Sequence, residues 1–411
     1  MKLLELLNTL LNFIEKTSEI NSSIYPKSWI INSNEMLFIS RDNIEAYSIT
    51  IENIYGINKN IYTRFTRKKV YEFIENKILM AKRKDIKFTK KISETFFKEL
   101  ENIKPYSRYI ISPISGIRLD NLNKINISIF EIGKINQLKS NLFTNDEDGY
   151  YIAVKINDIY DDAIAIEEAK NRFSDFIRII VFLSGKNDKE ILIKTGLPSY
   201  PSISHEQMYV ETSFYQITEN MKDEFPSSEM NNRYIEKIPV DNNFFTKNKD
   251  FTKLWDIYEK QSLNKNISKK DKKDTMEKRL LYASIAIGES ALSRNIKNSI
   301  IYTSMALEIL FSFNENSMFQ RSIADKLSDT FAFFIGVDKE TRLSASKLIK
   351  TFYGLRSALV HGGNKKVNND YIVINMYLRF IIKELLNNEK YKNIKTINDL
   401  YTMVKEAQYS Y

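Results

Sequence analysis

The segment YGLRSALVHGG, residues 353–363, places an arginine and a histidine five residues apart in front of two glycines. Arginine stays charged and binds a phosphate through two parallel hydrogen bonds. Histidine exchanges a proton near neutral pH. Together these groups can cleave RNA without a metal ion, because RNA carries its own nucleophile, the 2′-hydroxyl. Arg356 and His361 are therefore the candidate catalytic pair.

The same spacing also fits a helix end that carries no chemistry. The apolar spacing predicts a buried helical stripe made of Leu348, Phe352, Leu355 and Leu359. Arg356 borders this stripe and His361 falls in the final turn. Five residues turn a regular helix by about 500°, so the two side chains diverge by about 140°. They converge only if the arginine reaches around the helix, if the helix distorts at the glycines, or if a second chain supplies the other copy. A helix-capping cation is the alternative reading of this segment.

Three further residues, Glu308, Ser357 and Tyr353, accompany the pair as supporting candidates. Glu308 lies on an apolar helix, and it is either a surface residue or a support for Arg356. Tyr353 lies three residues before Arg356 on the same helix face, either as part of the core or as a platform for a base. The other histidine of the chain, His205, lies in a Pro/Ser-rich stretch before a strand and is interpreted as an ordinary surface residue.

The composition excludes several classes of site. The chain has no cysteine and two histidines, which removes disulfides, thiol nucleophiles, Cys-type zinc sites and a His-rich metal cage. A magnesium site held by carboxylates stays open. No Walker A loop, GxGxxG motif or GxSxG elbow occurs. A nucleotide hydrolase or a serine hydrolase is therefore not expected, and no cofactor is predicted.

Charge and hydropathy indicate the surroundings of the protein. The net charge is +9, and the part from Asp271 onward, with 21 Lys+Arg against 15 Asp+Glu, carries six of these charges. A polyanion partner for this part and an ordinary solvated surface both fit. The first residues predict an amphipathic helix instead of a signal peptide, and no run of about 18 apolar residues occurs. We expect a cytoplasmic protein with no membrane segment.

Proline usage divides the chain. No proline follows Pro239, and proline costs about 3 kcal/mol inside a helix. Helical periodicity in this tract predicts an antiparallel bundle of helices over 274–294, 299–313, 322–336, 338–363, 370–388 and 396–408. Asp338 is the expected N-cap of the fourth helix, and Gly362–Gly363 its expected end.

The preceding part mixes strands and helices, which predicts an α+β chain. Strands are expected over 29–40, 46–56, 106–133, 150–156, 189–196 and 208–217. Helices are expected over 67–84, 93–102, 163–185 and 251–261. The basic stretch 262–274 is the candidate junction. The predicted domains are therefore an α+β domain, 1–262, and an all-α domain, 263–411.

The tract from about 274 to 390 resembles a HEPN domain, and most of all the Apea-like HEPN group of bacterial antiphage proteins. The family carries an Arg-x4-6-His motif near the end of a helix, which Arg356 and His361 match. YTSMALEILFSF is similar to the family's Ala-Leu-Glu helix, with Glu308 as its acidic residue. Many HEPN ribonucleases carry Asn, Asp or His after the arginine, and this chain has Ser357, a residue also found in Apea-like members.

This resemblance implies metal-independent RNA cleavage at a composite site, where two HEPN domains dimerise and each gives an Arg and a His. It also implies an antiphage role in which the N-terminal domain senses a phage-derived trigger and regulates the nuclease. RNA is then the substrate and a second copy of the chain the partner. The alternative is a non-catalytic HEPN dimer that serves as an RNA- or protein-binding adaptor.

Overall fold

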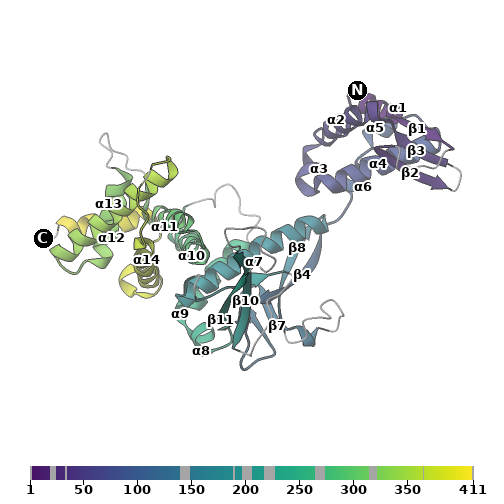
Figure 1. Cartoon of the computed structure of the whole chain (residues 1–411). Helices are drawn as coiled ribbons and strands as arrows, with labels where there is room; N and C mark the ends of the chain where they lie inside the picture. Colours follow the sequence, from purple (N-terminus) through teal and green to yellow (C-terminus); the bar gives the residue numbers. More distant parts are fainter. Residues whose placement is uncertain are drawn as a thin grey trace. The chain divides into compact units, whose positions relative to one another are not determined.

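The computed structural model describes residues 2–18, 25–32, 35–138, 149–187, 190–196, 206–216, 227–263, 274–313, 322–363 and 365–409. The chain divides into two compact units (Figure 1). The first holds Met1–Ile110 and Lys155–Lys170, and the second holds Ile111–Val154 and Asn171–Tyr411. The predicted α+β class is confirmed. The boundary expected between residues 262 and 263 falls inside the second unit and stays a prediction.

The first unit packs helices against a small antiparallel sheet of order β1-β3-β2. Its strands are β1 (Ile14–Thr17), β2 (Lys27–Asn32) and β3 (Glu35–Ile39). Its helical elements are α1 (Lys2–Phe13), η1 (Arg41–Asn43), α2 (Ile44–Tyr55), α3 (Lys59–Arg64), α4 (Arg67–Arg83), α5 (Lys90–Glu94) and α6 (Lys98–Glu101). Leu10, Ile39, Ile54 and Ile74 are fully buried in one shared core. The predicted amphipathic first helix and the helix over 67–84 are therefore confirmed.

The strand predicted over 46–56 is wrong, because this segment lies in helix α2. Its buried side chains are Tyr47, Thr50, Ile51 and Ile54. Spacings of three and four residues place all of these on one helix face. The β-branched and aromatic content favours a strand locally, and burial of the helical face outweighs that preference.

A sheet of order β6-β7-β8-β4-β9 lies largely in the second unit, and the first residues of β4 and the last residues of β8 belong to the first unit. The strands are β4 (Tyr106–Ser115), β6 (Lys124–Ile127), β7 (Phe130–Lys134), β8 (Tyr150–Ile159) and β9 (Lys194–Thr195), with η2 (Ile135–Gln137) after β7. A parallel pair, β5 (Ile117–Arg118) and β12 (Ile238–Pro239), accompanies it. Strands predicted over 106–133 and 150–156 are confirmed. Of the strand expected over 189–196, only β9 forms within the described residues.

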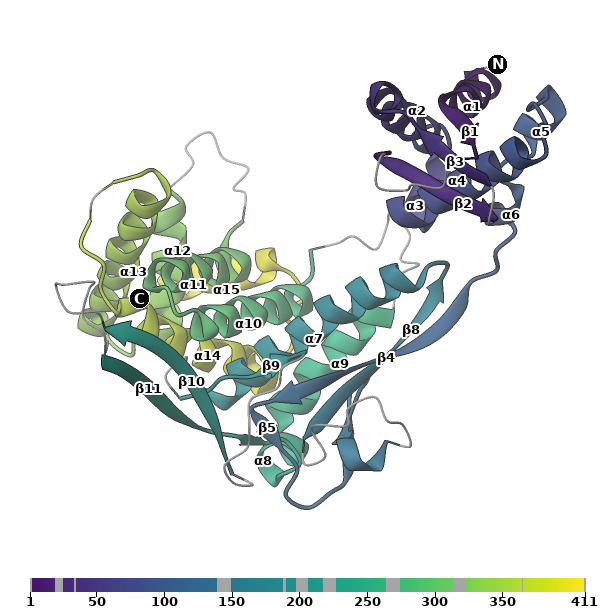
Figure 2. The ribbon, with the colours of Figure 1, turned by 45° about the vertical axis from the view of Figure 1, so that its right-hand side comes forward.

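Aromatic side chains join this sheet to two long helices, α7 (Asp162–Ser184) and α9 (Lys249–Leu263), both predicted from the sequence. Phe130 on β7 lies 5.1 Å from Phe176 on α7 and 5.8 Å from Trp255 on α9, measured between ring centroids. Phe176 and Trp255 are themselves 5.5 Å apart. This cluster fixes both helices to one face of the sheet (Figure 2).

A long antiparallel hairpin follows the sheet in sequence. Strand β10 (Gln207–Gln216) pairs with β11 (Ser227–Glu236) from Gln207 opposite Glu236 to Gln216 opposite Ser227. The first strand was predicted and is confirmed. The second was not expected, because its sequence, SSEMNNRYIE, shows no apolar alternation. Helix α8 (Asn243–Lys247) comes next.

The last part of the chain forms the predicted helices. They are α10 (Met276–Leu292), α11 (Ile296–Phe311), α12 (Ile323–Ile335), α13 (Lys339–Val360), α14 (Asp370–Asn387) and α15 (Ile397–Tyr409), with η5 (Glu389–Tyr391) between the last two. A buried polar triangle fixes three of them. Asn375 on α14 donates to Ser290 on α10 at 2.9 Å and accepts from Thr303 on α11 at 3.0 Å. Ser290 and Thr303 share a hydrogen bond of 2.9 Å.

Helix α10 also approaches α7 very closely at one point. A Cβ atom added to Gly288 would lie 2.0 Å from the carbonyl oxygen of Arg178. The Arg178 side chain forms an ion pair with Glu289, the next residue of α10. Glycine is therefore required at 288, and the bundle is packed directly against a helix of the sheet layer.

Candidate functional site

Helix α13 carries the candidate pair, and its two ends are fixed as the sequence predicts. Asp338 is the N-cap and forms a capping box with Thr341. The backbone N–H of Thr341 donates a hydrogen bond to Asp338 Oδ1 at 2.8 Å. At the other end Gly362 has φ +76°, and the N–H of Gly363 donates to the carbonyl of Ala358 at 2.7 Å. This is the geometry of a Schellman cap, which glycine favours because it lacks a Cβ.

The buried face of α13 is rotated from the predicted one. The buried side chains are Ala345, Ile349, Phe352 and Leu355. Leu348 and Leu359, expected in the stripe, are only partly buried. The side chains that follow the buried stripe around the helix, Tyr353 and Arg356, are likewise partly buried. They therefore lie at the edge of the bundle core, where a charged group keeps some contact with water.

Arg356, Glu308 and Tyr353 meet at this edge. The Arg356 guanidinium lies 3.4 Å from Glu308 Oε1, and the two side chains are 26% and 30% exposed. Tyr353 Oη donates to the same Glu308 oxygen at 2.8 Å. The Arg356 guanidinium also lies 5.5 Å from the centroid of the Tyr353 ring. One carboxylate of α11 thus holds two side chains of α13.

The electrostatics of this cluster favour a neutral tyrosine and leave donor capacity on the arginine. Burial, and then the hydrogen bond to the Glu308 carboxylate, raise the pKa of Tyr353 to about 12. Arg356 Nε is buried and has no hydrogen-bond partner. A buried donor without a partner costs roughly 1–3 kcal/mol. The guanidinium therefore retains one buried N–H without a hydrogen-bond partner.

His361 lies apart from this cluster. It is the C-cap residue of α13, its side chain is exposed, and its backbone N–H donates to the Ser357 carbonyl at 3.1 Å. Among the described residues, no hydrogen bond or ion pair links its imidazole to Arg356. Ser357 is partly buried and contributes that carbonyl to the last turn. Within one chain the structure brings Arg356, Glu308 and Tyr353 together and leaves His361 at the surface.

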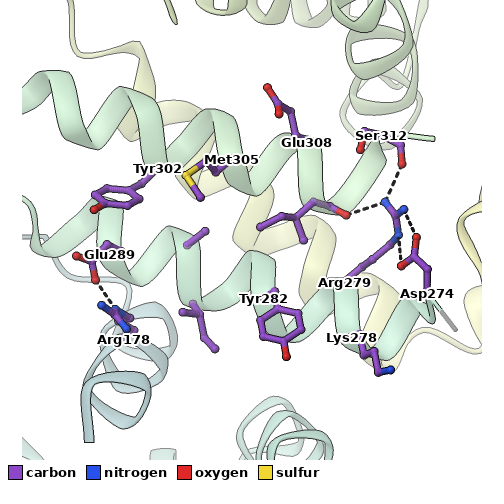
Figure 3. Close-up of a pocket in the computed structure, with 13 residues that line it drawn as sticks. Arg178, Asp274, Lys278, Arg279, Tyr282, Glu289, Tyr302, Met305, Glu308 and Ser312 are labelled. Carbon is purple, nitrogen blue, oxygen red and sulfur yellow. Dashed lines mark hydrogen bonds and ion pairs between the residues drawn. The ribbon is translucent and has the colours of Figure 1, made fainter. Parts of the chain in front are cut away.

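An open groove of about 720 Å³ runs between α10 and α11 and has Glu308 in its lining (Figure 3). Its floor is apolar, with Ile285, Ala286 and Ile309, and Tyr282 and Met305 stand at 51% and 41% exposure. The Arg178–Glu289 pair lies at one end of the groove, and the Arg279–Asp274 pair lies at the other (Figure 3). Reasoning from the sequence missed this groove, although apolar residues beyond the core stripe of α11, such as Met305, are a signal for it.

The described residues form neither a metal cluster nor a membrane-spanning helix. They contain no group of three or more His, Cys, Asp or Glu side chains placed to hold a metal ion. None of their helices is both long enough and apolar enough to cross a bilayer. His205 lies outside the described residues, as does most of the basic junction 262–274.

The chain matches no protein-family model, no curated protein and no solved structure. The resemblance of residues 274–390 to HEPN domains therefore rests on the sequence motif alone.

Proposed function

We propose that this protein is a metal-independent endoribonuclease of the HEPN type, acting in the cytoplasm in antiphage defence. The observation that carries the proposal is the cluster at the end of α13. There, Arg356 sits in a helical bundle beside an acidic residue of the preceding Ala-Leu-Glu helix and has an unsatisfied N–H. His361 lies at the surface within the same segment.

The proposed reaction is attack of a ribose 2′-hydroxyl on the adjacent phosphorus. The new P–O bond forms as the bond to the 5′-oxygen of the next nucleotide breaks. A general base removes the 2′-hydroxyl proton, and a general acid protonates the leaving 5′-oxygen. Arg356 binds the non-bridging oxygens and stabilises the charge that develops on them. The products carry a 2′,3′-cyclic phosphate and a 5′-hydroxyl.

We further propose that the site is completed by a second copy of the chain. Base and acid are two roles, and each chain has one histidine at this motif. The His361 side chain is exposed, and so it is accessible to a partner. In a symmetric dimer, two copies of His361 supply both roles on either side of one phosphate, and the two copies of Arg356 bind it.

A second candidate function is a non-catalytic HEPN dimer that binds RNA or protein as an adaptor. The pairing of Arg356 with Glu308 favours it, because a carboxylate at 3.4 Å competes with a phosphate for the guanidinium. In either case we propose that the N-terminal part senses a phage-derived trigger.

The decisive experiment measures cleavage of a structured RNA by the full chain in EDTA. Activity should persist without metal, and the fragments should end in 2′,3′-cyclic phosphate. An RNA with a 2′-deoxy nucleotide at the cleavage site should not be cleaved there. Arg356→Ala should remove the activity, whereas Lys347→Ala, an exposed cation of the same helix, should retain it. Activity that disappears in EDTA and returns with magnesium, or equal cleavage of DNA, would refute the mechanism.

A further inference from the structure

The end of α4, the start of α5 and the connection between them, all in the first unit, are strongly basic. Residues 80–93 contain six Lys or Arg and one acidic residue, Asp85. Five of the cations are exposed: Arg83, Lys84, Lys87, Lys90 and Lys91. Within the part of the chain that the structure describes, none of these five forms an ion pair, and Asp85 is already paired with Lys16 at 3.4 Å. We call these five residues the basic segment.

Several other cations of the same unit have carboxylate partners. Lys27 pairs with Glu75, Lys77 with Glu99, and Arg67 with Glu52. The basic segment therefore concentrates like charge, whereas these three cations are balanced by carboxylates. Repulsion between like charges destabilises a compact state, and a bound polyanion offsets that repulsion.

The basic segment is held on a fixed backbone. Asn8 of α1 donates to the Phe88 carbonyl at 3.3 Å and accepts from the Phe88 N–H at 3.1 Å. Lys82 Nζ donates to the Leu11 carbonyl of the same helix at 3.2 Å. Phe88 itself is buried in the core of the unit. Binding a ligand here requires little ordering of the backbone, which favours affinity.

We propose that the basic segment is a nucleic-acid contact surface that binds the phosphate backbone of a double helix. Four of its five cations are lysines, which contact phosphates as flexible point charges. The neighbouring aromatic residues Phe88, Phe96 and Phe97 are buried in the core, and so they cannot stack on unpaired bases. The surface therefore suits contact with the phosphates of a duplex, independent of sequence, more than contact with unpaired bases.

A lipid surface fits the basic segment less well. Binding in the plane of a bilayer uses an amphipathic helix with one apolar and one cationic face. Helix α5 has only five residues. The exposed face of α4 that leads to the segment is neither apolar nor cationic, since Glu72 and Asn76 lie there before Met80. Anionic vesicles therefore serve as the competing arm of the test.

The test measures binding of the full chain to a short labelled RNA duplex, to a DNA duplex of the same sequence and to phosphatidylserine vesicles, over a range of salt. The variant replaces four lysines by glutamine: Lys84, Lys87, Lys90 and Lys91. The matched control makes the same change in the other basic stretch of the chain, at Lys269, Lys270, Lys272 and Lys273. Unchanged thermal unfolding shows that both variants are folded.

Both duplexes should bind with an affinity that falls as salt rises. The logarithmic salt slope changes by about 0.9 for each phosphate contact, so the four-lysine variant should lower it by at least about 2. Such a slope also predicts roughly a hundredfold weaker binding at 0.1 M salt. An equal loss in the control variant, no loss in the four-lysine variant, or binding to vesicles in place of duplexes would overturn the proposal. Binding to DNA, which lacks the 2′-hydroxyl, separates this result from the success or failure of the proposed nuclease.

Discussion

Glu308 and Arg356 form an ion pair of 3.4 Å between α11 and α13, and both side chains keep about a quarter to a third of their surface in water. Pairs of this exposure contribute little to stability, about 0–1 kcal/mol. What the pair does contribute is orientation, since Tyr353 binds the same carboxylate oxygen. The guanidinium is thereby fixed at the edge of the bundle.

If Glu308 and Tyr353 position Arg356, changing either should slow RNA cleavage while the thermal unfolding temperature stays nearly unchanged. We expect Glu308→Gln to lower kcat by about 10- to 100-fold, the size of loss that misplacement of a catalytic group causes. Tyr353→Phe removes only the hydroxyl and should have a smaller effect in the same direction. Steady-state kinetics measures kcat of both variants, and thermal unfolding serves as the control for folding. Full activity in Glu308→Gln would show that the carboxylate has no positioning role.

The two histidines should behave differently. His361→Ala should abolish cleavage, because general acid–base catalysis contributes about 10²–10⁴-fold. The side chain is exposed, so the variant should fold normally. His205→Ala should leave the rate unchanged. Initial rates on one structured RNA compare the two, and equal losses would contradict the assignment.

Assembly gives an independent test of the composite site. We expect light scattering to report twice the mass of one chain, with contacts through the helices that carry Glu308 and Arg356. Met305 on α11 is 41% exposed, and Met305→Glu should convert the dimer to a monomer and remove cleavage. Phe380→Glu on α14, where the side chain is 50% exposed, is the matched control and should leave both intact. A wild-type chain that stays monomeric at all concentrations would count against the composite site.

Two helical glycines should respond oppositely to alanine. Gly288→Ala forces a Cβ to 2.0 Å from the Arg178 carbonyl and should destabilise the protein by about 1–3 kcal/mol, as overpacking does. At Gly354 on α13 the added Cβ meets only the flexible end of Lys365, at 3.4 Å. Gly354→Ala should therefore stabilise the protein by roughly 0.5–1 kcal/mol, the difference in helix propensity. Urea unfolding of both variants measures the two free energies of unfolding. If both variants were more stable than the wild type, α10 and α7 would have to move apart at Gly288 without cost, which would contradict the prediction.

The helices of the last part of the chain were predictable because each carries a clear 3.6-residue pattern and good caps, such as Asp338 and Gly362. Helix α2 was mistaken for a strand because its apolar residues are mostly β-branched or aromatic, and local preference hid the helical spacing. Strand β11 was missed for the opposite reason. The strand forms through backbone pairing with β10, and its own residue pattern does not predict that pairing.

The candidate site was predictable only in part. Arg356 and Glu308 were named from the motif, and the structure places them in contact. That Tyr353 joins the same carboxylate depends on how α11 and α13 pack, and spacing along one helix cannot supply it. The groove beside Glu308 likewise exists only because α10 and α11 lie against each other.

The glycine contact between α10 and α7 limits how the protein can be shortened. A fragment that begins near residue 270 contains every residue of the Arg-x4-His motif, yet it lacks α7. The side of α10 at Gly288 would then be exposed to water, and Glu289 would lose its ion pair with Arg178. A fragment with a newly exposed packing surface is prone to self-association. If the isolated bundle failed to cut RNA, the missing contact with α7 would be a sufficient explanation. A minimal nuclease must therefore keep the sheet and the helices packed on it.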